Sequence, residues 1–503
     1  MSVAFNTTPG NLRVPFFYAE INSGGSPFAG NARMLLIGQK TSAGVMTAGV
    51  PYGPIQSEAE IIAKAGLGSM LHAMYNIARR NAPFQPVYVL PLADPTGAFA
   101  TGTINVNAGT AIGATGAGIM RVMGRRVVLQ VNATDTAATT AAAIVAGINA
   151  ANLPITAAVD GTNTYQVNLT ARHKGALGNA IVVKVATDEP NIFTGTNCVA
   201  SAMTSGSGVP DLATPLANLG DQVYDWLASP YADTTSLNTT RDFLNDTSGR
   251  WSPYQQLYGH YTTVLYDTLA NLCTFGDGRN DQHATIVGSR VSPTPPWEWA
   301  AALAAQEVQH LSTAPELSRP MQTLVLQGVL PPDDRSTWWD IVDRQALYSN
   351  GIAAIKVNGD GTVAIDRLCT TYQTNASGAP DVTFLDIETM AQAMFVPRYF
   401  RTAISNAHSR QALADDNPFD LAEIATPKSI RNTVVHAYND LVALGVAENA
   451  DLFAKYVIVE RDPSNANRVN AYIPVDVVNQ LRIFGANITM FLQYRTASGQ
   501  LSV

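Results

Sequence analysis

The sequence predicts an α/β core that is interrupted by a β-rich insert and followed by a small α+β domain, with an extended arm at each end. Three observations predict this fold class. Residues 34–90 alternate strand, helix and strand, residues 96–208 change to threonine-, valine- and glycine-rich strands, and the first and last segments are strand-like without a nearby partner. At 503 residues the chain is long enough for two to four domains.

The core begins with a β-α-β unit. Met34–Gly38 and Pro86–Leu90 are short apolar runs, and Ser57–Asn81 places its apolar residues near helical spacing. A unit of this kind predicts the start of an α/β sheet. After the insert we expect strands at 222–227, 284–287 and 322–326, helices at 261–273, 295–310 and 340–347, and a hairpin of 353–357 with 363–365.

The insert differs in composition from the core. Residues 96–208 contain few charged side chains and no tryptophan, and one predicted helix, 136–151, lies among repeated strands. Turn-forming sequences at Asp94–Gly97 and Ser205–Gly208 connect the insert to the core. We expect the insert to face outward and to be partly dispensable, because insertions succeed where few contacts cross a boundary.

The C-terminal domain contains a well-marked helix. Thr426 is an N-cap residue, Pro427 suits the first helical position, and apolar residues continue to about residue 445. Strands are predicted at 456–460, 468–475 and 488–494. The expected parts of the chain are an N-terminal arm at 1–22, a discontinuous core at 23–95 and 209–420, the insert at 96–208, the C-terminal domain at 421–495 and a tail at 496–503.

Both terminal segments have the pattern of β-strands that lack a partner. Such strands can add to a sheet of a neighbouring copy of the protein, or they can be edge strands of their own domain. Glycines beside them are candidate hinges. The candidate arm residues are Val14, Phe16, Phe17, Tyr18 and Ile21 at the start and Ile488, Met490, Leu492 and Tyr494 at the end, and the candidate hinges are Gly24, Gly25 and Gly485.

Composition excludes several classes of protein. The net charge is −8 and no block of Lys and Arg occurs, so we expect no nucleic-acid partner. No window approaches the roughly 18 apolar residues that span a bilayer, so we expect no membrane insertion and synthesis in the cytoplasm. The three cysteines are too few and too scattered for a disulfide framework or a four-cysteine zinc site. Only 14% of the residues are charged, which favours close packing between copies.

Motifs of catalysis and cofactor binding are missing from the sequence. We find no Gly-x-Ser-x-Gly, no His-Glu-x-x-His and no complete P-loop, since Gly113–Gly118 is followed by Ile119 and Met120. The segment 358–362 begins like a calcium loop but lacks the later ligand, and we expect a tight hairpin turn there. We therefore predict no catalytic residues, no metal site and no cofactor.

Several stretches, in order along nearly the whole chain, resemble the tail sheath proteins of contractile-tailed phages, most closely the Mu-like group. No single stretch is as specific as a zinc or P-loop motif. The resemblance rests on the fact that the stretches occur in the same order as in that family. The stretches are 13–20, 171–179, 348–352 with 360–363, 426–431 and 467–470.

The resemblance implies a structural protein. Its core would have subtilisin-like topology without catalysis, and the three loops of a subtilisin triad are missing from this sequence. The terminal arms would weave subunits into a helical homopolymer, usually of sixfold rings, around an inner tail tube, with baseplate and tail terminator proteins as further partners. Contraction would drive the tube through the host envelope for genome ejection. The resemblance places this late protein in the virion tail, assembled in the bacterial cytoplasm.

Three alternatives remain open at this stage. A phage-derived particle such as a tailocin would have the same kind of sheath. A hydrolase on a subtilisin-like core is opposed by the missing triad loops, and a surface-array protein or adhesin by the absence of a signal peptide. Lys428 and Arg431 are candidates for a polar contact with the inner tube, and an ordinary solvated helix face is the other interpretation of these two residues.

Overall fold

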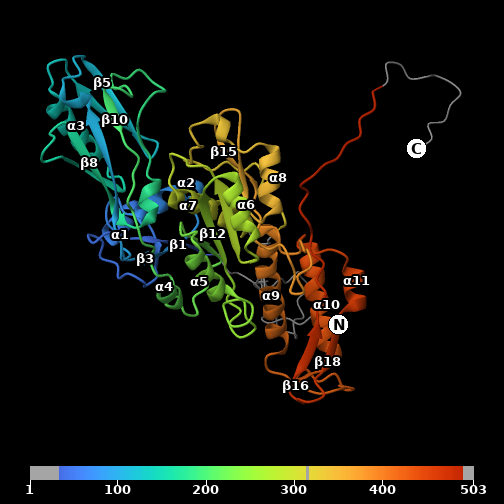
Figure 1. Ribbon diagram of the computed structural model, residues 1–503. Helices are drawn as coiled ribbons and strands as arrows, with labels where there is room; N and C mark the ends of the chain where they lie inside the picture. The colour runs from blue at the N-terminus through green and yellow to red at the C-terminus, as the bar shows by residue number, and fades with distance from the viewer. Residues whose placement is uncertain (1–32, 313–316, 491–503) are drawn as a thin grey trace, which may run out of the picture.

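The computed structural model describes residues 33–312 and 317–490 (Figure 1). A six-stranded sheet of order β13-β12-β11-β1-β3-β2 forms the centre. All neighbouring strands are parallel except β2, which pairs antiparallel with β3 at the edge. The strands are β1 (Met34–Gln39), β2 (Tyr52–Ile55), β3 (Val87–Leu92), β11 (Trp226–Ala228), β12 (His260–Tyr266) and β13 (Ala284–Ser289).

Helices cover both faces of this sheet, which explains why β1, β11 and β13 are buried along their whole length. Met34 and Leu36 of β1 point to one face and pack with α2 (Met70–Asn81) and α7 (Pro296–Leu311). Leu35 and Ile37 point to the other face and pack with α5 (Thr234–Leu244) and α6 (Leu269–Asp277). The remaining elements of this region are α1 (Glu58–Ala65), α4 (Ala213–Ala217), α8 (Ile341–Ser349) and the antiparallel hairpin of β14 (Ala354–Val357) and β15 (Val363–Arg367).

The insert is built of two antiparallel sheets and one helix, and it lies at the far left in Figure 1. One sheet has the order β10-β4-β8-β7 and the other β6-β5-β9. The helix expected at 136–151 is present, and Thr136 caps it. The elements are β4 (Phe99–Val106), β5 (Gly116–Val122), β6 (Arg125–Val131), α3 (Ala137–Ala150), β7 (Ile155–Val159), β8 (Gln166–Lys174), β9 (Val183–Val185) and β10 (Cys198–Ala200).

Polar side chains tie the insert to the core. The backbone N–H of Met70 donates to Nε2 of His173 at 3.0 Å, while Nδ1 of His173 lies 3.1 Å from Asp94. Arg125 pairs with the buried Glu298 at 2.9 Å, and Lys184 pairs with Asp333. The largest apolar cluster of the described residues runs without a break from the core into the insert. The insert is therefore packed onto the core and is held by more than its two connections.

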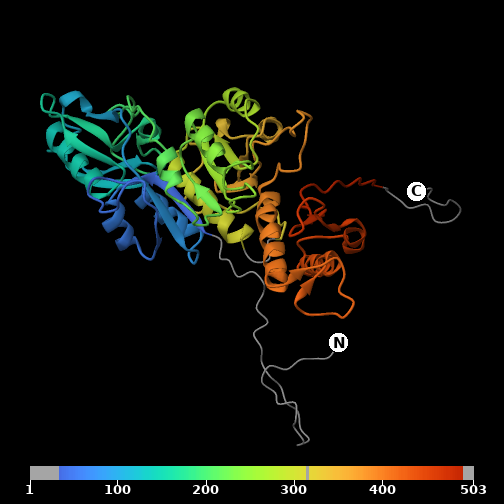
Figure 2. The ribbon, with the colours of Figure 1, turned by 90° about the horizontal axis from the view of Figure 1, so that it is seen from below.

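A long helix, α9 (Ile387–His408), joins the core to the C-terminal domain (Figures 1 and 2). Ile387, Ala391 and Met394 belong to the cluster of the core, whereas Phe395 and Phe400 belong to the cluster of the C-terminal domain. The latter is completed by α10 (Pro427–Ala443) and α11 (Ala450–Tyr456). Short strand pairs follow, namely β16 (Ala412–Leu413) with β17 (Ile424–Ala425) and β18 (Ile458–Arg461) with β19 (Val469–Tyr472). The apolar core of this domain thus includes residues before position 421.

Five expected elements differ from the structure. Of the expected strand 222–227, only the part from Trp226 has strand structure. The predicted helix 261–273 is wrong, because 260–266 form β12 and α6 begins only at Leu269. The single helix 57–81 is two helices, separated where Gly66 and Gly68 adopt positive φ angles of 93° and 70°. Residues 322–326 form no strand and make one isolated bridge, between Val325 and Ala364. In the expected strand 488–494, the described residues up to 490 have no strand structure.

Candidate assembly surfaces

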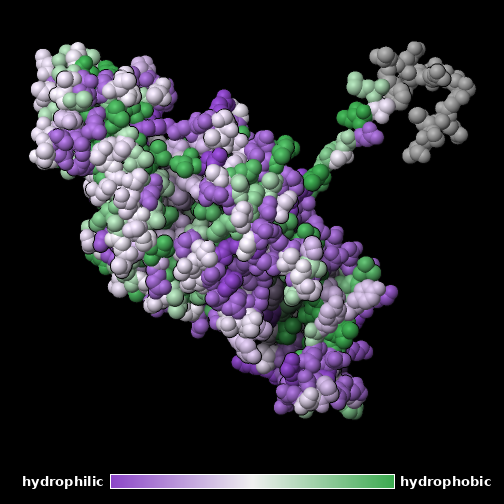
Figure 3. All heavy atoms as spheres, viewed as in Figure 1, coloured by the Kyte–Doolittle hydropathy of each residue, from purple (hydrophilic) through white to green (hydrophobic). Residues whose placement is uncertain are grey.

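The C-terminal segment from residue 483 leaves the body of the protein. Figures 1 and 2 show it extending away from every other element, and Figure 3 shows hydrophobic residues along it. No hydrogen bond of residues 483–490 to another described residue is seen. Large apolar side chains are exposed to solvent here, with Ile483 at 87%, Phe484 at 86%, Ile488 at 81% and Met490 at 90%. A run of this kind is a surface that a partner has to cover.

The segment just before it is attached to the body. Residue 477 forms an antiparallel bridge with Ala447, and the backbone N–H of Val478 donates to the carbonyl of Val446 at 3.0 Å. Arg482 makes ion pairs of 2.6 Å with Glu388 and 3.0 Å with Asp386. We call residues 476–482 the arm base and residues 483–490 the C-terminal arm. The last intramolecular contact before the arm is therefore that of Arg482.

The hairpin of β18 and β19 offers a place for a further strand. Only these two strands form the sheet, and two strands alone are marginal in water. Ile458 and Tyr472 lie directly opposite each other and are 54% and 62% exposed. Tyr456 and Leu452 of α11 precede them in the chain and are also exposed. The hairpin therefore combines an unpaired edge with exposed apolar side chains.

The structure places only part of the predicted arm and hinge residues. Ile488 and Met490 lie in the exposed arm. Gly485 is three residues beyond Arg482, and a Cβ atom added to it would meet nothing within 4 Å. Outside the described residues lie Val14, Phe16, Phe17, Tyr18, Ile21, Gly24, Gly25, Leu492 and Tyr494.

Lys428 and Arg431 lie in the first turns of α10 but differ in their surroundings. Thr426 and Ser429 form a capping box that fixes the start of this helix. The side chain of Lys428 is exposed. Arg431 is half-buried, and its guanidinium donates to the carbonyls of Ala454 and Val457 at the end of α11. Arg431 thus joins two helices of its own domain, and Lys428 remains the better candidate for an external polar contact.

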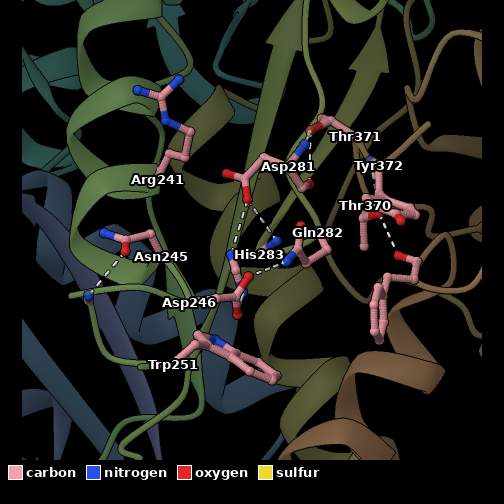
Figure 4. A network of polar contacts seen from close by, with 12 residues as sticks. Arg241, Asn245, Asp246, Trp251, Asp281, Gln282, His283, Thr370, Thr371 and Tyr372 are labelled. Atoms are coloured by element: carbon pink, nitrogen blue, oxygen red, sulfur yellow. Dashed lines mark hydrogen bonds and ion pairs between the residues drawn. The ribbon is translucent and has the colours of Figure 1, made fainter. Parts of the chain in front are cut away.

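A buried polar cluster around His283 is the most enzyme-like feature of the described chain (Figure 4). The ring lies between two carboxylates, with Nδ1 3.2 Å from Asp281 and Nε2 3.2 Å from Asp246. Burial alone would lower the pKa of His283, but the two carboxylates outweigh it and raise that pKa. Because both ring nitrogens face carboxylates, neither is directed at a hydroxyl nucleophile, as a Ser-His-Asp triad requires.

The cluster also connects separate parts of the core. Thr371 accepts from the N–H of Asp281 at 3.0 Å and donates to its carbonyl at 2.9 Å, which connects β13 to the segment after β15. The ring of Trp251 packs against His283, with centroids 4.9 Å apart. Within residues 33–312 and 317–490 there is no group of three His, Cys, Asp or Glu side chains placed to hold a metal ion. None of the described helices is both long and apolar enough to cross a membrane.

Comparison with known proteins identifies the family of this chain. Residues 205–371 match the family described as phage tail sheath protein central domain, and residues 379–491 match the phage tail sheath C-terminal domain. The second match begins before α9 and includes the arm base and the C-terminal arm.

Related proteins cover the whole chain. The Mu-like prophage FluMu tail sheath protein of Haemophilus influenzae is 32% identical over 501 residues, which are 98% of this chain and 100% of that protein. The solved sheath tail protein of Desulfitobacterium hafniense has 12% identity and a TM-score of 0.47, over 92% of this chain and 100% of that chain. The contracted helical sheath of the anti-feeding prophage has 13% identity and a TM-score of 0.49, over 95% and 99%. With two sheath domains in order and a full-length relative, the chain belongs to the phage tail sheath protein family, in its Mu-like contractile group.

Proposed function

We propose that this protein is the structural subunit of a contractile tail sheath, which polymerises helically around an inner tail tube and shortens to drive the tube through a host envelope. The C-terminal arm supports this function more than any other feature. It presents apolar side chains that are 81–90% exposed at Ile483, Phe484, Ile488 and Met490, and a second copy of the chain is the partner that a homopolymer supplies.

The arm is suited to strand addition in trans. It is extended, and the hairpin of β18 and β19 has an unpaired edge beside exposed Ile458 and Tyr472. A strand of about eight residues would add several backbone hydrogen bonds, each worth roughly 0.5–1.5 kcal/mol net. One arm would then contribute on the order of 3–8 kcal/mol. Such a link would persist while neighbouring subunits move relative to each other, because it depends on a tethered strand and not on the contact between two rigid surfaces.

The core acts as a scaffold in this proposal. A mostly parallel sheet with helices on both faces is consistent with the subtilisin-like topology expected of the core, and the position of His283 between two carboxylates favours a role without catalysis. Rings of sixfold symmetry, contacts with the tube, baseplate and tail terminator proteins, and assembly in the bacterial cytoplasm complete the proposed function.

Electron microscopy of the purified protein tests polymerisation. Negatively stained wild-type protein should form striated tubes. Deleting residues 1–22, or ending the chain after Arg482, should leave a soluble protein with a nearly unchanged melting temperature that forms no tubes. Tubes of normal length from both shortened chains would refute assembly through the arms. Dispersed wild-type monomers under all conditions would refute the sheath function itself.

A further inference from the structure

We propose that Arg482 is a positioning residue that anchors the arm base to the first turn of α9, so that a pull on the C-terminal arm is transmitted to the core of the subunit. This inference rests on the proposed function, in which the arm links neighbouring subunits. Without the anchor, the pull would act on the edge of the C-terminal domain and would peel residues 476–482 from it.

Four charged side chains form the anchor. Nη2 of Arg482 lies 2.6 Å from Glu388 and 3.0 Å from Oδ1 of Asp386. Arg367 donates to the same Oδ1 at 2.8 Å and to Oδ2 of Asp386 at 2.9 Å. Glu388 is fully buried, while the side chains of Arg482 and Asp386 are 12% and 14% exposed. Two arginines and two carboxylates give a neutral group, so removing Arg482 leaves an excess negative charge in a buried place.

The anchor connects three parts of the chain. Asp386 and Glu388 lie at the start of α9, and Arg367 is the last residue of β15 in the core. The other oxygen of Glu388 accepts from the backbone N–H of Met321 at 2.9 Å. A force on Arg482 is therefore passed to α9, to the β14–β15 hairpin and to the segment around Met321.

Amide side chains hold the rest of the arm base. Gln392 of α9 donates to the carbonyls of Val446 at 3.2 Å and Val478 at 3.3 Å. Gln480 donates to Ser318 and, at 3.4 Å, to Thr389. Arg482 is the last residue of this series, and every residue from 483 to 490 is exposed. The free arm thus begins directly after the charged contact.

The anchor uses a single nitrogen of the guanidinium. Nε and Nη1 of Arg482 are buried and make no hydrogen bond to the described residues. A lysine ammonium can replace a single N–H donor of a guanidinium, although it cannot replace the two parallel hydrogen bonds that a guanidinium makes with a carboxylate. The geometry therefore predicts that R482K keeps the anchor and that R482Q, which removes the charge, loses it.

Hydrogen exchange of the full-length chain tests the anchor. In R482Q the amide of Val478 should exchange roughly tenfold faster than in wild type, because its hydrogen bond to Val446 opens more often, while amides of α10 exchange at the wild-type rate. Microscopy should show fewer and irregular tubes. R482K should resemble wild type in both measurements. R410Q, which removes an exposed arginine of the same domain, serves as the matched control and should also resemble wild type.

The variant E388Q/R482Q keeps the test valid if R482Q fails to fold. It removes one charge of each sign, so it should fold and still show fast exchange at Val478. Wild-type exchange and wild-type tubes in R482Q or in the double variant would overturn the inference, as would an R482K protein that is as defective as R482Q. If wild-type protein forms no tubes, the proposed function fails, whereas the exchange of Val478 still decides whether Arg482 anchors the arm base.

Discussion

At the scale of single residues, the main surprise is how many charged groups are buried. Glu307 of α7 is fully buried, and the hydroxyl oxygen of Thr262 of β12 lies 2.8 and 2.9 Å from its two oxygens. Burial raises the pKa of Glu307 from 4.5 to about 8, although the bond from Thr262 lowers it. The folded protein therefore keeps the proton of Glu307 at neutral pH.

This shift predicts a pH dependence of stability. Between about pH 4.5 and 8 the folded state holds a proton that the unfolded state releases, so the free energy of unfolding falls as the pH rises through this range. E307Q has no such proton. We expect its melting temperature to fall less than that of wild type between pH 5 and 8. E423Q, which changes an exposed carboxylate, is the control and should follow wild type. Parallel pH curves for E307Q and wild type would contradict the raised pKa.

At the scale of elements, the sequence correctly predicts helices and hairpins that are marked by cap or turn residues within the same segment. Thr426 with Pro427 marked α10 and the turn 358–361 marked the β14–β15 hairpin, and the structure confirms both. Strand β12 was mistaken for a helix because residues 260–264 are all buried. A strand covered on both faces has no period of two, so it resembles a buried helix in sequence.

Other elements were missed because their stabilising contacts are distant in sequence. Helix α9 has Pro397 in its interior, which is an unfavourable signal for a helix, yet it packs against the core and the C-terminal domain at once. The arm was predicted from its apolar pattern, but the arm base was not. Arg482 meets Glu388 across 94 residues, and no pattern within one segment reveals such a pair.

Lys428 and Arg431 of α10 have different surroundings, so reversing the charge of each should have a different effect, one on assembly and the other on stability. K428E should melt like wild type and assemble poorly around inner tubes, because Lys428 is exposed and a polar contact there is lost. R431E should lose about 1.5–3 kcal/mol of stability, because the bonds to the end of α11 are broken. Thermal melting and co-sedimentation with tubes measure the two effects. K428E that assembles on tubes as readily as wild type would show that Lys428 makes no tube contact.

At the scale of the whole molecule, the insert and the core are more interdependent than the connections at 94–97 and 205–208 suggest. Trp297 and Met70 of the core are each 2% exposed, and Ile181 and His173 of the insert lie with them around one small cavity. Gln39 at the end of β1 also donates to the carbonyl of Lys174 at 2.9 Å. The insert therefore covers apolar surface that the core cannot cover alone.

This packing changes the expected result of removing the insert. Replacing residues 97–207 with a short Gly/Ser linker should give an aggregating protein, because burial of side chains such as Trp297 and Met70 contributes roughly 1.5–3 kcal/mol each. Adding W297Q and M70Q to the same protein should restore solubility. Solubility and size-exclusion profiles measure both. If the protein with the linker alone is soluble and forms tubes, the insert is dispensable and this prediction is wrong.

Helix α9 has a consequence for how the subunit deforms. Its 22 residues span about 33 Å. Pro397 removes one backbone hydrogen bond inside the helix, but the next residue, Arg398, is bound to Asp225 beside β11 at 2.5 Å. Because the helix is packed on both sides of Pro397, we expect little bending between the core and the C-terminal domain. In a sheath made of such subunits, shortening would change the contacts between neighbouring rigid subunits. The free energy of shortening would then come from the interfaces between subunits.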